Sequence, residues 1–196
     1  MPNLPIIPEY ITVHLGAPDS NAQNVTVPFA DYIKNVASSE IYPTWPENAI
    51  RANVYAQISY TLNRIYTEYY RSRGYDFDIT NSIAIDQSFV YGRDIFENVS
   101  MIVDEIFNDY VVRSGSIEPY FTAYCDGREI RCEGLEQWGT VDLANQGLSP
   151  LEILRYYYGD DINIVQDAPI ENISLSFPGV PLRLGSAGND VRTVQT

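Results

Sequence analysis

The stretch that decides the fold is 46-PENAIRANVYAQISYTLNRIYTEYYRSRG-74, the longest run of helical periodicity in the sequence. Apolar side chains recur in it every three or four residues, as they do on one face of an α-helix. These positions are Ile50, Val54, Ile58, Leu62, Ile65 and Tyr69. Proline is favoured in the first helical turn and glycine just past the last, so Pro46 and Gly74 mark the limits. We therefore expect a central core helix over Pro46–Arg73.

Shorter elements are predicted on both sides of this helix. Helical spacing of apolar residues predicts amphipathic helices over Phe29–Ser39 and Ile95–Phe107. Two short helices, over Gly134–Asn145 and Pro150–Tyr158, are each closed by a glycine. Residues 11–27 are predicted to form a strand followed by a loop, and residues 162–165 a last strand.

A β-hairpin is also expected, because residues 110–112 and 117–124 flank the turn sequence 113-RSGS-116. Helices and strands come in separate runs, without the alternation of a parallel sheet. The predicted fold class is therefore α+β: a compact single domain with a long central helix, several short helices and a small antiparallel sheet.

The composition of the sequence changes near its end. Residues 1–168 carry all the predicted elements, whereas residues 169–181 are rich in proline and read as a linker. Residues 182–196 are too few to enclose a core of their own. We expect them to begin a further domain.

Composition limits the classes of partner. The chain has 12 Lys and Arg residues against 26 Asp and Glu, with a formal net charge of −14. Nucleic-acid binding needs basic side chains that displace counterions from phosphates, and an acidic surface also repels anionic lipid headgroups. No apolar run approaches the 18 or so residues of a membrane span, and residues 1–10 lack the pattern of a signal peptide. Neutral or weakly charged polymers remain as partners.

The two cysteines, Cys125 and Cys132, lie seven positions apart around an Asp-Gly turn. The turn could bring them within bridging distance. A zinc site needs four ligands, and the single histidine, His14, is more than a hundred positions away. A local disulfide, two free buried thiols and a partial metal site all stay open.

Glu40 is the candidate for acid chemistry. It ends an apolar helix and is followed by the proline- and aromatic-rich loop 41-IYPTWP-46. Burial against Tyr42 and Trp45 would disfavour its charged form and raise its pKa. A carboxyl group protonated near neutral pH can donate its proton to a glycosidic oxygen. The alternative is that Glu40 is simply one of 26 acidic residues, solvated at a helix end.

The segment 31-DYIKNVASSEIYPTWPENAIRA-52 resembles the opening of the stage II sporulation protein D family, "GVVAAEMP" followed by "SWP" and "EALKAQAVAARTYA". Further along, 134-GLEQWGT-140 resembles "GMSQWGA", and 147-GLSPLEILRYYY-158 resembles "GxSYxEILxxYY". The tripeptide 90-VYG-92 is similar to the family's "QVYxG". The likeness covers residues 26–166.

This resemblance implies a lytic transglycosylase that acts on peptidoglycan glycan strands, with Glu40 at the position of the family's acid. The reaction cleaves the bond between N-acetylmuramic acid and N-acetylglucosamine and leaves a 1,6-anhydro end. Gln137 would hydrogen-bond an N-acetyl group and Tyr91 would stack on a sugar face. With Tyr42 and Trp45, they would line the groove around Glu40. No metal or other cofactor is expected, because Thr122 stands where relatives carry a zinc-binding histidine.

The end of the chain gives a second resemblance. The run 181-PLRLGSAGNDVRTVQ-195 looks like the start of a peptidoglycan-binding type 1 domain, "PLRLGSxGxDVxxLQ". A wall-binding module joined to a glycan-cutting domain would raise the effective concentration of the enzyme on its polymer.

The sequence thus predicts a transglycosylase of the cell wall or of the spore envelope and cortex. Two alternatives stay open. One is a non-catalytic module of the same fold that binds glycan or activates an amidase, as the related amidase enhancers do. The other is a structural spore-envelope protein, which the sixteen tyrosines would suit.

Overall fold

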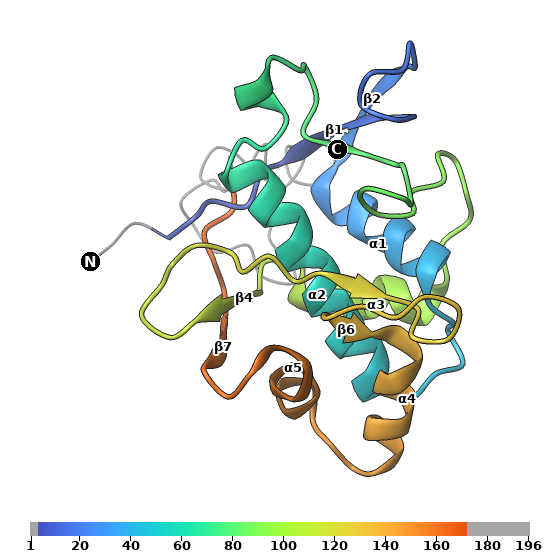
Figure 1. The fold of residues 1–196 in the computed structure, drawn as a ribbon, viewed down its shortest axis with the longest axis vertical. Coiled ribbons are helices and arrows are strands. Elements are labelled where there is room, and N and C mark those ends of the chain that lie inside the picture. Colours follow the sequence, from blue (N-terminus) through green and yellow to red (C-terminus); the bar gives the residue numbers. More distant parts are fainter. Residues whose placement is uncertain (1–3, 172–196) are drawn as a thin grey trace, which may run out of the picture.

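The predicted central helix is the axis around which the other elements pack. In the computed structural model, which describes residues 4–171, α2 spans Glu47–Tyr66 and is buried along most of its length. Helices α1 (Phe29–Glu40) and α3 (Glu97–Ile106) pack against it and against each other. Helices α4 (Gln137–Asn145) and α5 (Pro150–Tyr158) also contact it (Figure 1).

Helix α2 ends at Tyr66, so the predicted extension to Arg73 is wrong. Glu68 takes a left-handed φ of 50°, and the Tyr69 N–H donates to the Arg64 carbonyl, 3.0 Å away, in a turn that closes the helix. The Arg64 guanidinium then lies 3.7 Å from the Tyr69 ring centroid, so that cation and ring stack. Residues Arg71–Arg73 form a separate 3₁₀ turn before Gly74.

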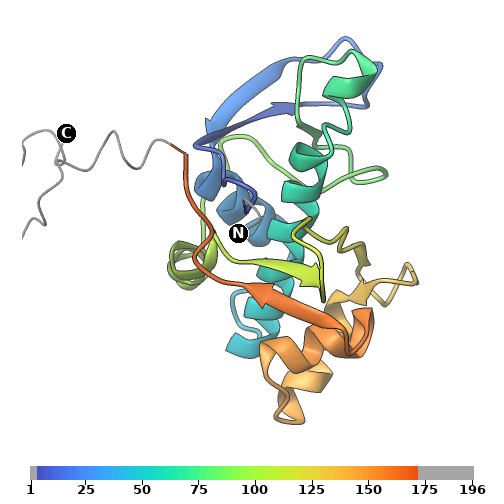
Figure 2. The ribbon, with the colours of Figure 1, turned by 90° about the vertical axis from the view of Figure 1, so that its left-hand side faces the viewer.

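The strands of the described residues form three small sheets. In the first, β1 (Tyr10–His14) pairs antiparallel with β2 (Asn24–Pro28) and parallel with β3 (Ile79–Thr80). The fold class is α+β, as expected, but the sheet structure is more divided than the single antiparallel sheet that was predicted. Figure 2 shows the β1–β2 hairpin at one end of the long axis and α4 and α5 at the other.

The predicted hairpin after residue 110 is wrong. Strand β4 (Tyr110–Arg113) instead pairs antiparallel with β7 (Ile162–Val165), and the Arg113 guanidinium forms an ion pair with Asp161 at 2.7 Å. Pro119 lies in the segment that was expected to pair with β4, and proline cannot donate to a strand ladder. That segment keeps one bond to β4, from the Tyr120 N–H to the Val111 carbonyl.

A third pair, β5 (Tyr124–Cys125) with β6 (Leu135–Glu136), is parallel. Gly134 precedes β6 and lies against the Ala123 backbone so closely that a Cβ there would collide with the Ala123 carbonyl oxygen. Only glycine fits this approach. The pair fixes the entry to α4, which begins directly after β6 at Gln137.

The two ends of the described chain are bonded to each other. Ile7 and Ile170 form a parallel bridge: the Ile7 N–H donates to the Pro169 carbonyl, and the Glu171 N–H donates to the Ile7 carbonyl, both at 2.8 Å. The first residues of the predicted linker, 169–171, are thus joined to residues 1–168. The rest of that linker and the predicted domain start at 182–196 lie outside the described residues.

A long irregular segment, residues 81–96, is held on α1 and α2 by side-chain hydrogen bonds. Asn35 donates to the Val90 carbonyl and accepts from the Val90 N–H, at 2.8 and 2.9 Å. Asp86, fully buried, pairs with Arg64 at 3.0 Å and accepts from Tyr60, Tyr70 and Thr80. This network determines where the neighbouring residues 87 and 88 lie.

Replacing Asp86 by asparagine removes the charge that Arg64 needs and places an amide donor among hydroxyl and N–H donors. Breaking a buried ion pair from one side leaves the other charge uncompensated. We expect Asp86→Asn to lower the free energy of unfolding by about 3–5 kcal/mol in urea titrations.

Asp104→Asn is the matched control, because the Lys34–Asp104 pair at 2.7 Å is also an ion pair but its carboxylate is 61 % exposed. An exposed pair contributes about 1 kcal/mol or less. Equal, small losses for both variants would contradict the role given to Asp86.

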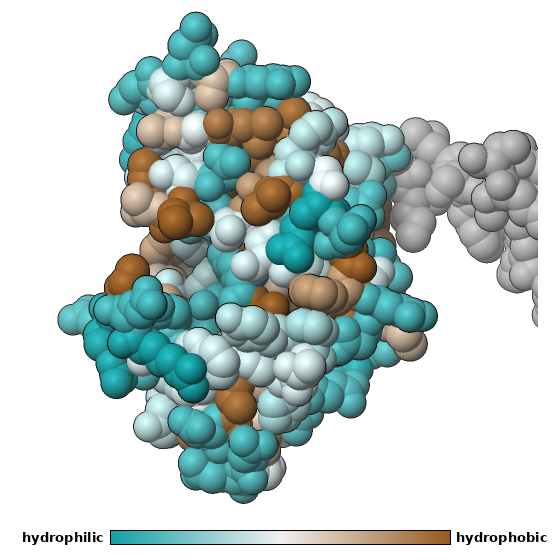
Figure 3. All heavy atoms as spheres, turned by 90° about the vertical axis from the view of Figure 1, so that its right-hand side faces the viewer, coloured by the Kyte–Doolittle hydropathy of each residue, from teal (hydrophilic) through white to brown (hydrophobic). Residues whose placement is uncertain are grey.

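The surface seen in Figure 3 carries apolar side chains in small separate groups among hydrophilic ones. No helix among residues 4–171 has both the length and the apolar character needed to cross a bilayer.

Candidate functional site

Glu40 is the last residue of α1, and the local sequence explains why the helix stops there. The Ile41 N–H still donates to the Ala37 carbonyl, but Ile41 itself is extended, with φ −126° and ψ 168°. Pro43 disfavours helical backbone in the residue before it, so the chain turns away. A carboxylate at a helix C-terminus lies in the negative end of the helix dipole, which opposes its ionisation.

Three donors surround the Glu40 carboxyl group, and each comes from a different part of the fold. The Ser88 N–H donates to Oε1 at 2.8 Å. Gln57 Nε2 in the middle of α2 donates to Oε2 at 3.1 Å, and Gln137 Nε2 at the start of α4 does so at 3.4 Å. The end of α1, the centre of α2, the irregular segment and α4 therefore converge on this one side chain.

Burial raises the pKa of Glu40 from 4.5 to about 7, and the three hydrogen bonds together with the nearby Tyr124 hydroxyl reduce this shift without cancelling it. The carboxyl group is thus protonated in an appreciable fraction of molecules near neutral pH. A group with this pKa can act as an acid and, after losing its proton, as a base.

A cavity of about 480 Å³ opens beside Glu40. Its walls come mainly from the irregular segment and from the loop after β5. The lining residues are Glu40, Ile83, Ala84, Asp86, Ser88, Tyr124, Cys125, Asp126, Ile130 and Gln137. The polar groups are few and gather around Glu40, as in many small-molecule and sugar sites.

The two other carboxylates of this cavity are already engaged. Asp86 is held by Arg64 and by hydroxyl donors. Asp126 Oδ1 accepts the backbone N–H groups of Ile130 and Arg128 at 2.8 and 3.0 Å, and these bonds keep the pKa of Asp126 below its ordinary value. Burial thus raises the pKa of Glu40, whereas backbone hydrogen bonds lower that of Asp126.

The loop that carries Asp126 is closed by a disulfide between Cys125 and Cys132. Of the three states that the sequence left open for these cysteines, the structure has the bridged one. Arg128 from the same loop stacks over the Trp138 ring, 3.5 Å from its centroid. The bridge and this stacking hold the loop at the edge of the cavity.

The predicted groove residues do not all meet at Glu40. Gln137 lines the cavity and contacts the carboxyl group. Tyr42 is 55 % exposed and packs with the buried Trp45 and with Trp138, with ring centroids 5.7 and 5.5 Å away. Tyr91 is 62 % exposed and lines a separate small cavity.

The structure adds three contacts that the sequence did not predict: Gln57, Ser88 and Tyr124. Gln57 gave a signal, because an amide on the apolar helix 46–74 needs a polar partner inside the core. Ser88 acts through its backbone N–H, which no side-chain pattern reveals. Tyr124 was one of sixteen tyrosines without a distinguishing context.

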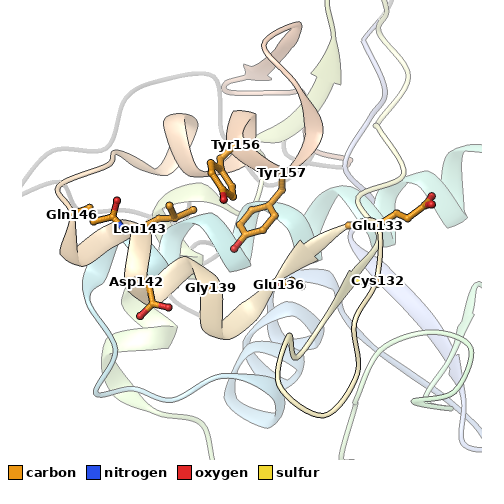
Figure 4. A pocket seen from close by; sticks show the side chains of 10 residues that line it. Cys132, Glu133, Glu136, Gly139, Asp142, Leu143, Gln146, Tyr156 and Tyr157 are labelled. Atoms are coloured by element: carbon orange, nitrogen blue, oxygen red, sulfur yellow. The ribbon is translucent and has the colours of Figure 1, made fainter.

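A second cavity, of about 500 Å³, lies between β6, α4 and α5 (Figure 4). Tyr156 and Tyr157 project from α5 towards it, opposite Asp142 of α4. A Cβ at Gly139 would meet the Tyr157 hydroxyl, so a larger residue here would displace the Tyr157 side chain. This cavity does not contain Glu40, and one of its carboxylates, that of Glu136, forms an ion pair with Arg131 at 2.9 Å.

Within residues 4–171, no three His, Cys, Asp or Glu side chains gather in an arrangement that could hold a metal ion. No protein-family model matches the chain, and no curated protein matches it either.

The raised pKa of Glu40 makes stability depend on pH in a defined direction. Between about pH 4.5 and 7 the folded state holds more protons than the unfolded state, so stability falls as pH rises and levels off above 7. Glu40→Gln removes this penalty. We expect the variant to be more stable than the unmodified chain by roughly 2–3 kcal/mol at pH 8 and equal to it near pH 4.

Urea unfolding at a series of pH values measures this difference. Glu129→Gln, which removes an exposed carboxylate from the loop after β5, should leave the pH dependence unchanged. A constant difference between Glu40→Gln and the unmodified chain at all pH values would show that Glu40 titrates normally.

Proposed function

We propose that this protein is a peptidoglycan lytic transglycosylase that cleaves the bond between N-acetylmuramic acid and N-acetylglucosamine. One observation carries the proposal: the Glu40 carboxyl group lies at a cavity of about 480 Å³ and has a pKa raised to about 7. A glycosidic oxygen is a weak base, and an acid that keeps its proton near neutral pH is what its departure requires.

The sequence resemblance supports the choice of substrate. The residues that resemble the stage II sporulation protein D family place its acid at Glu40 and its "SQWG" amide at Gln137, and in the structure these two side chains are in contact. The resemblance of residues 181–195 to the start of a peptidoglycan-binding domain points to the same polymer. We infer a place in the cell wall or the spore envelope and cortex.

The reaction uses one carboxyl group in two steps, first as an acid and then as a base. Glu40 donates its proton to the oxygen that leaves C1 of the muramic sugar, and positive charge develops at C1 and the ring oxygen. The C6 hydroxyl of the same sugar then attacks C1, and the Glu40 carboxylate accepts the hydroxyl proton. The products are a 1,6-anhydro end and a free sugar hydroxyl, no water is consumed, and Glu40 returns to its acid form.

The state of the other two carboxylates favours this route over ordinary hydrolysis. A retaining glycosidase needs a second carboxylate as nucleophile, and an inverting one needs a second carboxylate to activate water. Asp86 is buried in its ion pair, and Asp126 is occupied by the N–H groups of its own loop. In contrast, Gln137 presents an amide at the cavity, where it can bind an N-acetyl group of the strand.

The test is digestion of purified peptidoglycan, with the soluble fragments read by mass spectrometry. We expect anhydro-muramic ends from the unmodified chain and a loss of about 10²–10⁴-fold in rate for Glu40→Gln, because the acid is gone while the shape is kept. Glu129→Gln again serves as the control and should digest the wall at the unmodified rate.

Two other outcomes would replace the proposal. Reducing ends in place of anhydro ends would identify a hydrolase. Intact strands from all variants, with the protein still pelleting with the wall, would indicate a binding module, and stimulation of an added amidase would then identify an activator.

A further inference from the structure

Two buried polar atoms next to Glu40 have no hydrogen-bond partner among the described residues. They are the Tyr124 hydroxyl oxygen and Gln57 Oε1. Buried polar groups are nearly always bonded, because an unpaired one has lost its hydrogen bonds to water without replacement. Two such atoms beside the same titrating carboxyl group call for a common explanation.

The Tyr124 hydroxyl lies within hydrogen-bonding range of the Glu40 carboxyl group, close enough for each group to shift the pKa of the other, but in this structure it makes no hydrogen bond of good geometry. Burial, and then the neighbouring Glu40 charge, raise the pKa of Tyr124 well above its ordinary value. The hydroxyl therefore keeps its proton throughout the neutral range and is always available as a donor.

Glu40 has different requirements in its two states. The acid form has an O–H that needs an acceptor, and the carboxylate form needs donors on both oxygens. The unpartnered Gln57 Oε1 is an acceptor, and the unpartnered Tyr124 hydroxyl is a donor. Gln57 Oε1 can therefore accept the proton of the Glu40 acid form, and the Tyr124 hydroxyl can donate to the Glu40 carboxylate.

We propose that Tyr124 is a positioning residue that turns its hydroxyl onto the Glu40 carboxylate when Glu40 has given up its proton. This hydrogen bond would orient the carboxylate between its loss of a proton and its acceptance of the C6 hydroxyl proton. The inference therefore rests on the proposed function. Active-site hydrogen bonds that are poorly aligned without substrate commonly tighten during the reaction.

Other polar groups lie near Glu40 on the neighbouring elements, and none can take this part. Tyr32 of α1 donates its hydroxyl to Gln87 at 2.9 Å. Asp86 and Asp126 are acceptors with their own donors. The groups that reach Glu40 from α2 and α4 are the amides of Gln57 and Gln137, which do not titrate.

The decisive variant is Tyr124→Phe, which removes the hydroxyl and keeps the ring. A hydrogen bond to a charged group favours the ionised form, so its loss should raise the Glu40 titration midpoint by about one pH unit. The midpoint is read from ¹³C NMR of the labelled Glu40 carboxyl, without any assay of activity. The basic limb of the kcat/KM profile on peptidoglycan should move upward by the same amount.

Tyr158→Phe is the matched control. The Tyr158 hydroxyl is also buried and donates to the Ala123 carbonyl at 2.8 Å, but it does not contact Glu40. This variant should lose stability and leave the Glu40 midpoint in place. An unchanged or lowered midpoint in Tyr124→Phe would overturn the inference.

If Tyr124→Phe fails to fold, the unmodified chain still gives an answer. The ¹³Cζ resonance of labelled Tyr124 should shift with a midpoint near 7 and stay constant in Glu40→Gln. A resonance that is constant in both proteins would refute the proposed bond. Absence of anhydro products, with these titrations as expected, would count against the proposed function alone.

Discussion

The structure depends on a stripe of polar side chains inside the most buried helix. Asn53, Gln57 and Thr61 follow one another at four-residue intervals on α2, so they share one face. Their side chains bond Thr140 of α4, Glu40 of α1 and Gln87 of the irregular segment, at 2.8, 3.1 and 2.7 Å. Buried polar groups must be paired, so these bonds restrict how α1, α4 and the irregular segment can lie against α2, which apolar packing alone would not do.

The raised pKa of Glu40 follows from this constraint. The stripe holds the end of α1 at the wall of the cavity, where partial burial opposes ionisation, and supplies the Glu40 carboxyl group with a neutral amide donor. A nearby arginine would have favoured the ionised carboxylate. Glu40 and Asp86 are thus held differently inside the fold, Glu40 by neutral amides and a backbone N–H and Asp86 by an ion pair with Arg64.

The sequence predicted the helices well, because their apolar periodicity is local. Glu40 was found for the same reason, since a helix end and a following proline can both be read from neighbouring residues. The walls of the cavity could not be predicted in this way: Ser88 reaches Glu40 across 48 positions through its backbone, from a segment without periodicity. Tyr42 and Tyr91 were chosen for their aromatic character, but in the structure their rings are exposed and lie beside Trp45 and Phe89 instead of Glu40.

The bridge between Ile7 and Ile170 has a mechanical consequence. The two segments run parallel, so tension applied to the chain at opposite ends would slide them past each other instead of peeling them apart. The two backbone bonds, together with that from the Glu9 N–H to the Glu171 carboxylate at 3.1 Å, would then bear the load at the same time. A protein pulled between two attachment points would resist at this clamp, while the helices and the cavity behind it stayed free of strain.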